Sequence, residues 1–233
     1  MTHTRFLKIA PVITVFTAII LGGMMSTSKS VKAGDNDETA ESKIQRGFEI
    51  APVPLNLHGK SRALVGLGSY IVNAVGDCNG CHSKGPTTEF AAGGNPNTLS
   101  PPFTGTKELN LGTYLGGGRD FGPFGSLPHL YSRNLTPDKT GRPAGGLTYE
   151  EFVEIMRKGT DFDHVHPPCT APGTPANCLA APFNGDLLQV MRWPFFKDMT
   201  DNDLRAIYEY LSAIPCNPGP GIAGAPYLQN ECE

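Results

Sequence analysis

The chain has 233 residues and a formal net charge of −3 at pH 7, enough for one well-packed domain with extensions but tight for two domains. Its 28 glycines and 21 prolines exceed ordinary usage, and charged residues make up only 18%. We therefore expect turns and irregular loops over much of the chain, and this composition excludes a chain built mainly of long charged helices.

An export signal is predicted at the N-terminus. Two basic residues precede an apolar run over residues 9–25, and Val31-Lys32-Ala33 has the small-residue form of a signal-peptidase site. The run is short for a membrane span and contains proline and glycine. We expect residues 1–33 to be a signal peptide, with retention as an inner-membrane anchor as the alternative, and a periplasmic or otherwise extracytoplasmic location. Removing this segment leaves a formal charge of −7, which argues against nucleic acid and anionic lipid as partners.

A helical domain is expected after a short lead-in. Residues 34–60 are polar and then interrupted by proline, which predicts an extended lead-in packed on the domain. Residues 61–75 carry apolar side chains at spacings of three and four, as an amphipathic helix does, and Gly76 stops the pattern. The apolar positions are Leu64, Leu67, Ile71 and Val75.

Two more helices are predicted, separated by long loops. Thr148 and Glu151 form a capping-box pattern at the start of one helix, which Gly159 should end. The last helix begins after Thr200 with acidic residues at its positive end and should stop before Pro215. The domain thus spans residues 61–215, with few helices and long loops.

The chain has six cysteines, and an exported protein is expected to use them in bonds. Cys78 and Cys81 form one close pair. For the other four, proximity favours disulfides Cys169–Cys178 and Cys216–Cys232 among three possible connectivities. The second of these would tie down a C-terminal tail, residues 216–233.

The sequence Cys78-Asn79-Gly80-Cys81-His82 is the main chemical motif. Two thiols at this spacing can add to both vinyl groups of a haem, and the histidine that follows can bind its iron. A zinc half-site would need a second close Cys/His pair, and a redox dithiol would need strand-helix-strand surroundings. Neither occurs here, so the motif predicts one covalently bound haem c.

The second axial ligand is less constrained by the sequence. The sulfur candidates are Met156, Met191 and Met199, and the imidazole candidates are histidines 58, 129, 164 and 166. Met156 fits the core face of a helix, and Met199 precedes a helix cap. Met191 lies in an irregular apolar segment that ends in Trp193 and could close one face of a haem. We therefore favour Met191, with His164 and His166 as the main rivals.

Several motifs occur together along the chain: Gly68 with Tyr70, the motif at 78–82, Ser132–Asp138, the helix at 149–159, Met191–Pro194 and Met199–Leu204. Together they resemble the class I cytochrome c modules found singly or in tandem beside periplasmic dehydrogenases. The resemblance covers residues 61–215 and implies a mostly α fold, with three or more short helices around one covalent haem.

The resemblance also implies roles for individual residues. It makes His82 and Met191 the axial ligands and places the Asn-Leu-Thr-Pro stretch, with Asn134, Leu135 and Pro137, along the haem. These modules usually have proline directly after the methionine, whereas this chain has Arg192. In the fold the first and last helices cross, with a small residue against an aromatic one, which here would be Gly68 against Tyr208 or Tyr210.

Electron transfer is the function that these features favour. A monohaem carrier would take single electrons from a donor such as a periplasmic dehydrogenase and pass them to a cytochrome or oxidase acceptor. A haem enzyme or ligand sensor would instead need an open sixth position and a distal acid-base residue, for which His129, His164 and His166 are the candidates. A third alternative is a haem that only stabilises the fold.

Overall fold

The computed structural model describes residues 33–97, 107–122, 129–162, 186–223, 225 and 228–233. Within these ranges the regular structure is mostly helical, as predicted, and β pairing is limited to three isolated bridges. The elements in chain order are α1 (Ala33–Ile50), α2 (Arg62–Tyr70), η1 (Ile71–Val75), α3 (Cys78–His82), α4 (Pro143–Gly146), α5 (Tyr149–Lys158), α6 (Trp193–Phe196) and α7 (Asp201–Leu211). None of the described helices is both long and apolar enough to cross a membrane.

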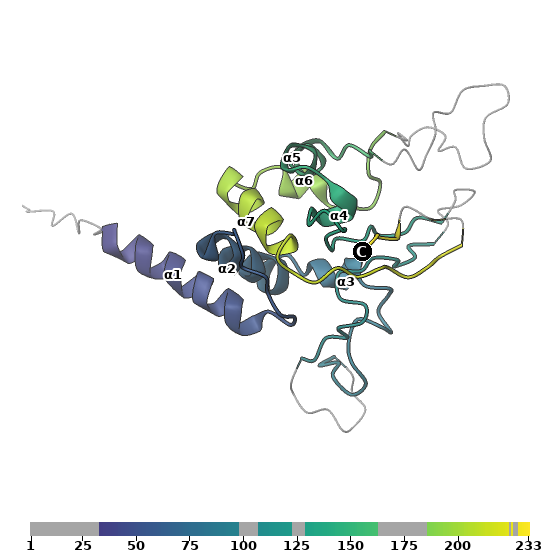
Figure 1. Cartoon of the computed structure of the whole chain (residues 1–233), viewed down its shortest axis with the longest axis horizontal. Coiled ribbons are helices and arrows are strands. Elements are labelled where there is room, and N and C mark those ends of the chain that lie inside the picture. Colours follow the sequence, from purple (N-terminus) through teal and green to yellow (C-terminus); the bar gives the residue numbers. More distant parts are fainter. Residues whose placement is uncertain (1–32, 98–106, 123–128, 163–185, 224, 226–227) are drawn as a thin grey trace, which may run out of the picture.

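The core forms where α2 and α7 cross, at the centre of the molecule (Figure 1). At the crossing Gly68 faces the backbone of Ala206 and the Cβ of Tyr210, and a Cβ built on Gly68 would lie 1.9 Å from the Ala206 carbonyl oxygen. Only glycine permits this approach. The predicted contact between Gly68 and an aromatic residue is confirmed, with Tyr210 as the aromatic partner.

The helix predicted over residues 61–75 is present but changes type within its length. The Ser61 hydroxyl accepts a hydrogen bond from the Leu64 N–H at its start, and the last turn, η1, is a π-helix. In that turn Asn73 donates from Nδ2 to the Tyr210 hydroxyl at 3.1 Å and accepts at Oδ1 from the Tyr114 hydroxyl at 2.6 Å. These bonds to distant segments fix Asn73, and the pattern ends at Gly76 as predicted.

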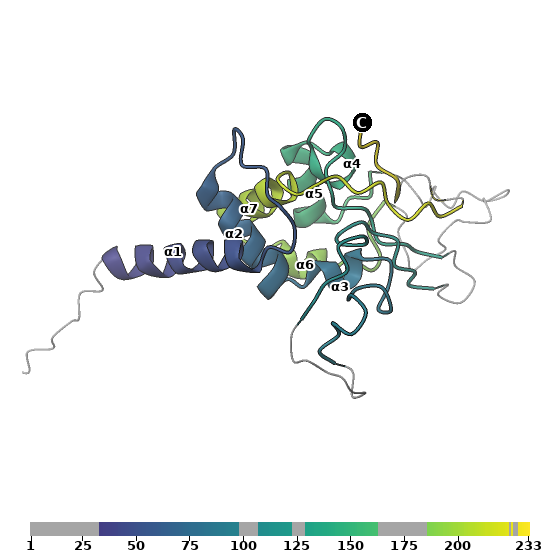
Figure 2. The same ribbon diagram turned by 60° about the horizontal axis from the view of Figure 1, so that its bottom comes forward.

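The prediction that residues 34–60 form an extended lead-in is wrong over most of that length, because α1 is a helix of 18 residues. Its glycine at position 47 lies directly against Gly66 of α2, so the two backbones nearly touch. The Ser69 hydroxyl donates to the Gly47 carbonyl at 2.6 Å, and the Arg62 guanidinium lies 4.1 Å from the centre of the Phe48 ring. Packing on α2 therefore stabilises a helix that its own polar sequence did not indicate. Figure 2 shows α1 continuing past α2, away from the rest of the domain.

The caps predicted for α5 and α7 are confirmed. Thr148 and Glu151 form a full capping box, and Gly159 ends α5 in the left-handed conformation with φ 74°. Thr200 caps α7 by accepting from the Asp203 N–H. The last helix ends at Leu211, earlier than predicted, and the chain turns before Pro215 through a hydrogen bond from the Ala213 N–H to the Tyr210 carbonyl.

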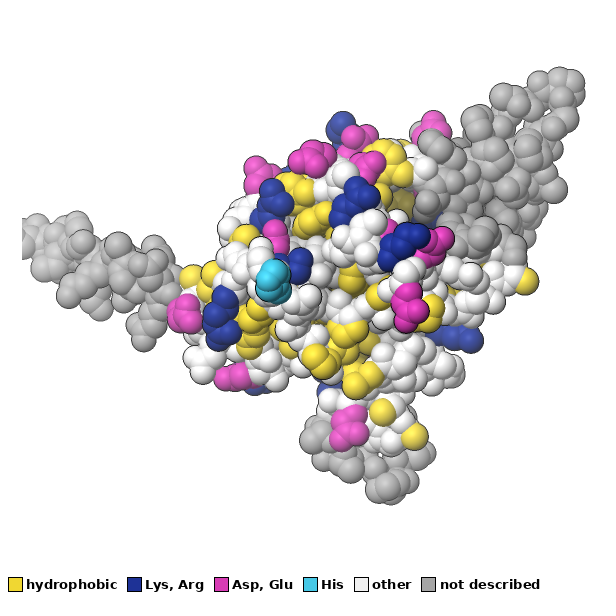
Figure 3. All heavy atoms as spheres, viewed as in Figure 1, with side chains coloured by type: hydrophobic (Ala, Val, Ile, Leu, Met, Phe, Trp, Pro, Cys, Tyr) yellow, Lys and Arg dark blue, Asp and Glu magenta, His cyan; other side chains and the backbone are white. Residues whose placement is uncertain are grey.

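The described parts of the long loops lie at one end of this helical core (Figure 1). Isolated β-bridges join Asp120 to Tyr131 and Thr160 to Leu187, so these loop segments are paired at single positions without forming strands. The predicted disulfide Cys216–Cys232 is confirmed, whereas Cys169 and Cys178 lie outside the described residues. On the surface, acidic and basic side chains are interspersed over the face in Figure 3.

Candidate haem site

One mostly apolar cavity lies beside α3 and is walled by the long loops. Its floor comes from the helical core through Ile71, Met156 and Ile207, and both thiols of the cysteine motif border it. The side chains that line its walls are Phe121, Leu130, Leu135, Leu188, Val190, Met191, Phe196 and Met199, with Tyr131, Ser132, Arg133, Asp161, Gln189 and Arg192 as polar members. Residues from distant parts of the sequence therefore enclose the motif at 78–82.

The short helix α3 presents the cysteines to this cavity. Asp77, with a left-handed φ of 45°, turns the chain sharply from η1 into α3. Asn79 points the other way and is buried, where its Oδ1 accepts from the Leu115 N–H at 2.9 Å. Arg119 donates to the Gly80 carbonyl. The helix is thus held from its outer side, which leaves Cys78, Cys81 and His82 on the cavity.

The orientation of His82 is fixed by its neighbours. Its Nδ1 lies 2.8 Å from the Arg133 carbonyl oxygen, which can only accept, so Nδ1 carries the proton and Nε2 keeps a free lone pair. Burial lowers the pKa of His82, which favours the neutral ring. A neutral imidazole whose second nitrogen is hydrogen-bonded to a carbonyl is the form that binds metals in proteins.

The thiol of Cys78 does not resemble that of a reactive dithiol. Burial, and then the negative charge of Asp77, raise the pKa of Cys78 to about 12. Redox dithiols and zinc thiolates instead lie in surroundings that lower the thiol pKa. The Cys78 thiol is therefore protonated at neutral pH, because burial and the Asp77 charge outweigh the backbone hydrogen bond that favours the thiolate.

Three methionines border the cavity, which the sequence did not predict. Met191 lies in the bend before α6, Met199 lies just before α7, and Met156 belongs to α5 and is buried in the core. Met191 is therefore on the same cavity as His82, as the sequence-based interpretation requires. Of the histidine candidates, His58 and His129 lie outside the lining, and His164 and His166 lie outside the described residues.

The other predicted haem neighbours divide into two groups. Leu135 lines the cavity, whereas Asn134, Pro137 and Trp193 do not. The Asn134 amide instead donates to the Asn217 carbonyl at 2.8 Å, and the Trp193 ring covers Gly159 and donates from Nε1 to the Leu188 carbonyl at 3.2 Å. Asn134 and Trp193 thus stabilise the backbone of the cavity walls without lining the cavity.

The cavity wall also contains an ion pair, between Arg133 and Asp161, that the sequence did not predict. Arg133 Nη2 lies 2.9 Å from Asp161 Oδ1, and the Asp161 side chain is only 4% exposed. Arg133 directly precedes the Asn-Leu-Thr-Pro stretch, which gave a sequence signal for its position. Nothing in the sequence pairs it with Asp161, because that contact depends on how two long loops fold together.

The donor set and the walls fit a covalently held haem. Two thiols, an imidazole with a free nitrogen and a thioether border a cavity whose remaining lining is largely apolar, as a flat hydrophobic macrocycle with a central iron requires. The wall also contains hydrogen-bond donors for a haem's carboxylates, among them Ser132 and Arg133.

Comparison with known proteins gives no matching family model and no significantly matching solved structure. Among curated proteins, the fructose dehydrogenase cytochrome subunit of Gluconobacter japonicus is 24% identical over 166 residues, which are 71% of this chain. The gluconate 2-dehydrogenase cytochrome c subunit of Pantoea cypripedii is 29% identical over 149 residues, or 64% of this chain. The cytochrome c subunit of the quinone alcohol dehydrogenase of Gluconacetobacter polyoxogenes is 28% identical over 148 residues, also 64%.

These relatives are much longer than this chain. The matched residues make up 24%, 22% and 21% of the relatives' own lengths, so the similarity is that of one module. The chain is similar to cytochrome c subunits of dehydrogenases, and the predicted resemblance is confirmed. Together with the helical architecture, this confirms the predicted fold class, the mostly α class I cytochrome c fold.

Proposed function

We propose that this chain is a monohaem c-type cytochrome that carries single electrons between a periplasmic dehydrogenase and a downstream cytochrome or oxidase. One observation carries the proposal: Cys78, Cys81, His82 and Met191 border the same cavity. Similarity to the cytochrome subunits of three dehydrogenases supports the same class of work. The number of haems, the ligands, the location and the partners belong to the proposal.

On the proximal side, the chain provides attachment and one ligand. Cys78 and Cys81 would hold haem c by thioether bonds, and His82 would bind its iron through Nε2. The hydrogen bond from His82 Nδ1 to the Arg133 carbonyl prevents rotation of the ring and increases its donor strength. The bound haem supplies one-electron chemistry, with iron changing between the ferrous and ferric states.

On the distal side, Met191 would be the second ligand. A thioether is a soft donor that favours ferrous iron, and the apolar lining disfavours the extra charge of ferric iron, so both features raise the reduction potential. If His82 and Met191 both hold the iron, no site would remain open on it for a substrate. These properties suit a carrier better than a peroxidase or sensor, which needs an open position.

Haem attachment is tested by mass spectrometry of chain exported together with a cytochrome c maturation system. We expect one haem per chain, retained after acid-acetone extraction. Replacing Cys78 and Cys81 together by alanine should release the haem on extraction, while the matched control, Cys216→Ser with Cys232→Ser, should retain it. Haem that resists extraction from the Cys78 and Cys81 variant contradicts the proposal.

The distal ligand is tested by spectroscopy of the three cavity methionines. Met191→Ala should abolish the weak sulfur-to-iron band at the red end of the oxidised spectrum, lower the potential and allow carbon monoxide to bind. Met156→Ala and Met199→Ala remove equal side-chain volume from the same cavity and should keep the band. If Met191→Ala keeps a six-coordinate spectrum with an unchanged band, the ligand lies elsewhere and His164 and His166 are tested next.

A further inference from the structure

We propose that the C-terminal tail, residues 216–233, positions the proximal histidine and thereby sets the reduction potential of the site. The tail lies beyond the region that resembles cytochrome c modules, and its disulfide has no part in binding haem. The inference rests on the proposed haem, since it concerns the ligand field of its iron.

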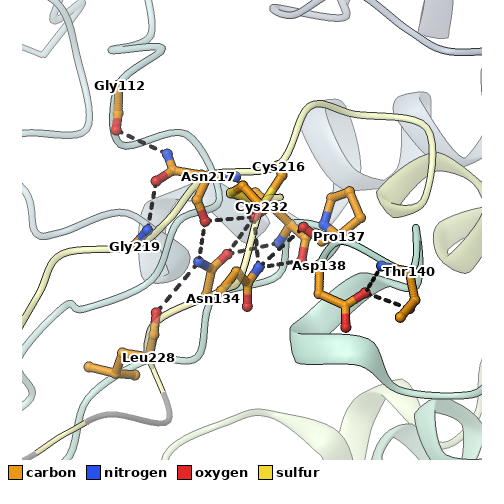
Figure 4. Close-up of a disulfide and its surroundings, with 12 residues drawn as sticks. Gly112, Asn134, Pro137, Asp138, Thr140, Cys216, Asn217, Gly219, Leu228 and Cys232 are labelled. Carbon is orange, nitrogen blue, oxygen red and sulfur yellow. Dashed lines mark hydrogen bonds between the residues drawn. A yellow bond between two sulfur atoms is a disulfide. The ribbon is translucent and has the colours of Figure 1, made fainter.

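The tail is joined to the loop at 133–137 by hydrogen bonds that are buried or partly buried (Figure 4). Asn134, only 2% exposed, donates from Nδ2 to the Asn217 carbonyl at 2.8 Å, and its Oδ1 accepts from the N–H and hydroxyl of Thr136. The Thr136 hydroxyl oxygen accepts from the Asn217 N–H at 3.0 Å. From the far end of the tail, Asn230 Nδ2 donates to the Thr136 carbonyl at 2.8 Å. Both ends of the tail thus bind the same short loop.

The disulfide keeps those two ends together. Cys216 directly precedes Asn217, and Cys232 lies two residues after Asn230, so the bond closes the tail into a ring around its contacts with the loop. The ring is packed inside as well: the Leu228 side chain is fully buried, and Gly219, with φ 87°, lies against the Leu228 carbonyl. The tail is therefore a closed clamp rather than a loose extension.

The clamped loop holds His82 directly. Arg133, the residue before Asn134, provides the carbonyl oxygen that accepts from His82 Nδ1 at 2.8 Å. Next to it, Gly118 N–H donates to the Ser132 carbonyl at 2.8 Å, and Gly117 N–H donates to the His82 carbonyl at 2.7 Å. The tail also contacts the segment 112–118, because Asn217 Nδ2 donates to the Gly112 carbonyl at 3.0 Å. The tail is therefore bonded both to the loop that holds the His82 ring and to the segment that holds the His82 carbonyl.

The direction of the effect follows from the histidine hydrogen bond. An imidazole that donates to a carbonyl is a stronger electron donor and stabilises ferric iron, which lowers the reduction potential. A loosened tail lets the Arg133 carbonyl move away from Nδ1, so the bond weakens and the potential rises. None of the hydrogen bonds described above between the tail and the loop at 133–137 involves Met191, so we expect the distal ligand to be retained.

The experiment uses the full chain with its haem attached. Cys216→Ser with Cys232→Ser opens the clamp, and Asn230→Ala removes its bonds to Thr136 while the disulfide stays intact. Lys139→Ala is the matched control, because it deletes an exposed ion pair between Lys139 and Glu231 of the tail that does not bear on Arg133. For each variant we measure the midpoint potential, the sulfur-to-iron band and the NMR shifts of the His82 ring protons.

We expect both clamp variants to raise the midpoint potential and shift the His82 resonances with the sulfur-to-iron band unchanged, while Lys139→Ala matches the wild type. If the clamp variants lose stability to urea but keep the wild-type potential and His82 shifts, the tail only stabilises the fold and the inference is overturned. If the disulfide variant does not fold, the Asn230→Ala result alone decides. Failure of haem attachment in the wild type would instead refute the proposed function.

Discussion

The crossing of α2 and α7 depends on the absence of a side chain at Gly68, and Gly68→Ala should therefore destabilise the protein strongly. A Cβ at this position would lie 1.9 Å from the Ala206 carbonyl oxygen, whereas such contacts are essentially never under 3.0 Å, so the two backbones must separate by about 1 Å. Overpacking costs about 1–3 kcal/mol. A gap of that size also forfeits about a quarter to a half of each dispersion contact between buried residues such as Val65 and Leu204.

Helix propensity acts in the opposite direction, since alanine is better than glycine inside a helix by about 1 kcal/mol. We expect a net loss of about 3 kcal/mol in the free energy of unfolding, measured by urea denaturation followed by far-UV circular dichroism. Asn202→Ala, at an exposed position in the first turn of α7, is the control and should change stability by less than about 0.5 kcal/mol. A Gly68→Ala protein as stable as the wild type would refute the close crossing.

Two further substitutions test the hydrogen bonds that fix the helices. Tyr114→Phe leaves Asn73 Oδ1 without its donor and removes one of the two partners of the Tyr210 hydroxyl, so it should lower the free energy of unfolding by about 1–3 kcal/mol. Tyr149→Phe, which removes an exposed hydroxyl, should cost much less. In the capping box, the N–H of Thr148 holds the pKa of Glu151 below its ordinary value, so the carboxylate contributes stability above the unfolded pKa and loses it as pH falls through the folded one. The stability difference between wild type and Glu151→Gln in urea should therefore be present at pH 6 and shrink by pH 3, and a difference that grows on acidification would contradict the capping role.

The sequence predicted a helix well where the interactions that stabilise its ends lie within a few residues of one another. The capping box of α5 and the glycine at its end act within one turn, so their pattern is visible in the sequence and in the fold alike. The helix α1 has no such signal. It is helical because Gly47 allows close contact with Gly66, and that partner is 19 positions away. A polar segment that is helical because it packs against a neighbouring helix cannot be predicted to be helical from its own periodicity.

The same distinction explains the candidate site. The motif at 78–82 contains both thiols and the imidazole within five residues, so its chemistry alone predicts a covalently attached haem. Asn134 was also singled out, but its neighbour on the chain, Leu135, lines the cavity while Asn134 faces the tail. Adjacent residues in an extended segment point to opposite sides, and only the fold decides which side is the cavity.

Arg192 shows how a departure from the related modules is accommodated. Proline usually follows the methionine in them, and here φ at Arg192 is −81°, close to the value that proline imposes. The φ of Arg192 is thus one that proline could also adopt, and the Arg192 carbonyl accepts from the Phe195 N–H at 3.0 Å to start the helix. The guanidinium lies 4.6 Å from the centre of the Phe195 ring, which is 66% exposed, so a contact at the surface holds the charge. The side chain of proline is therefore dispensable at this position, because the turn that places Met191 on the cavity is maintained by the start of α6.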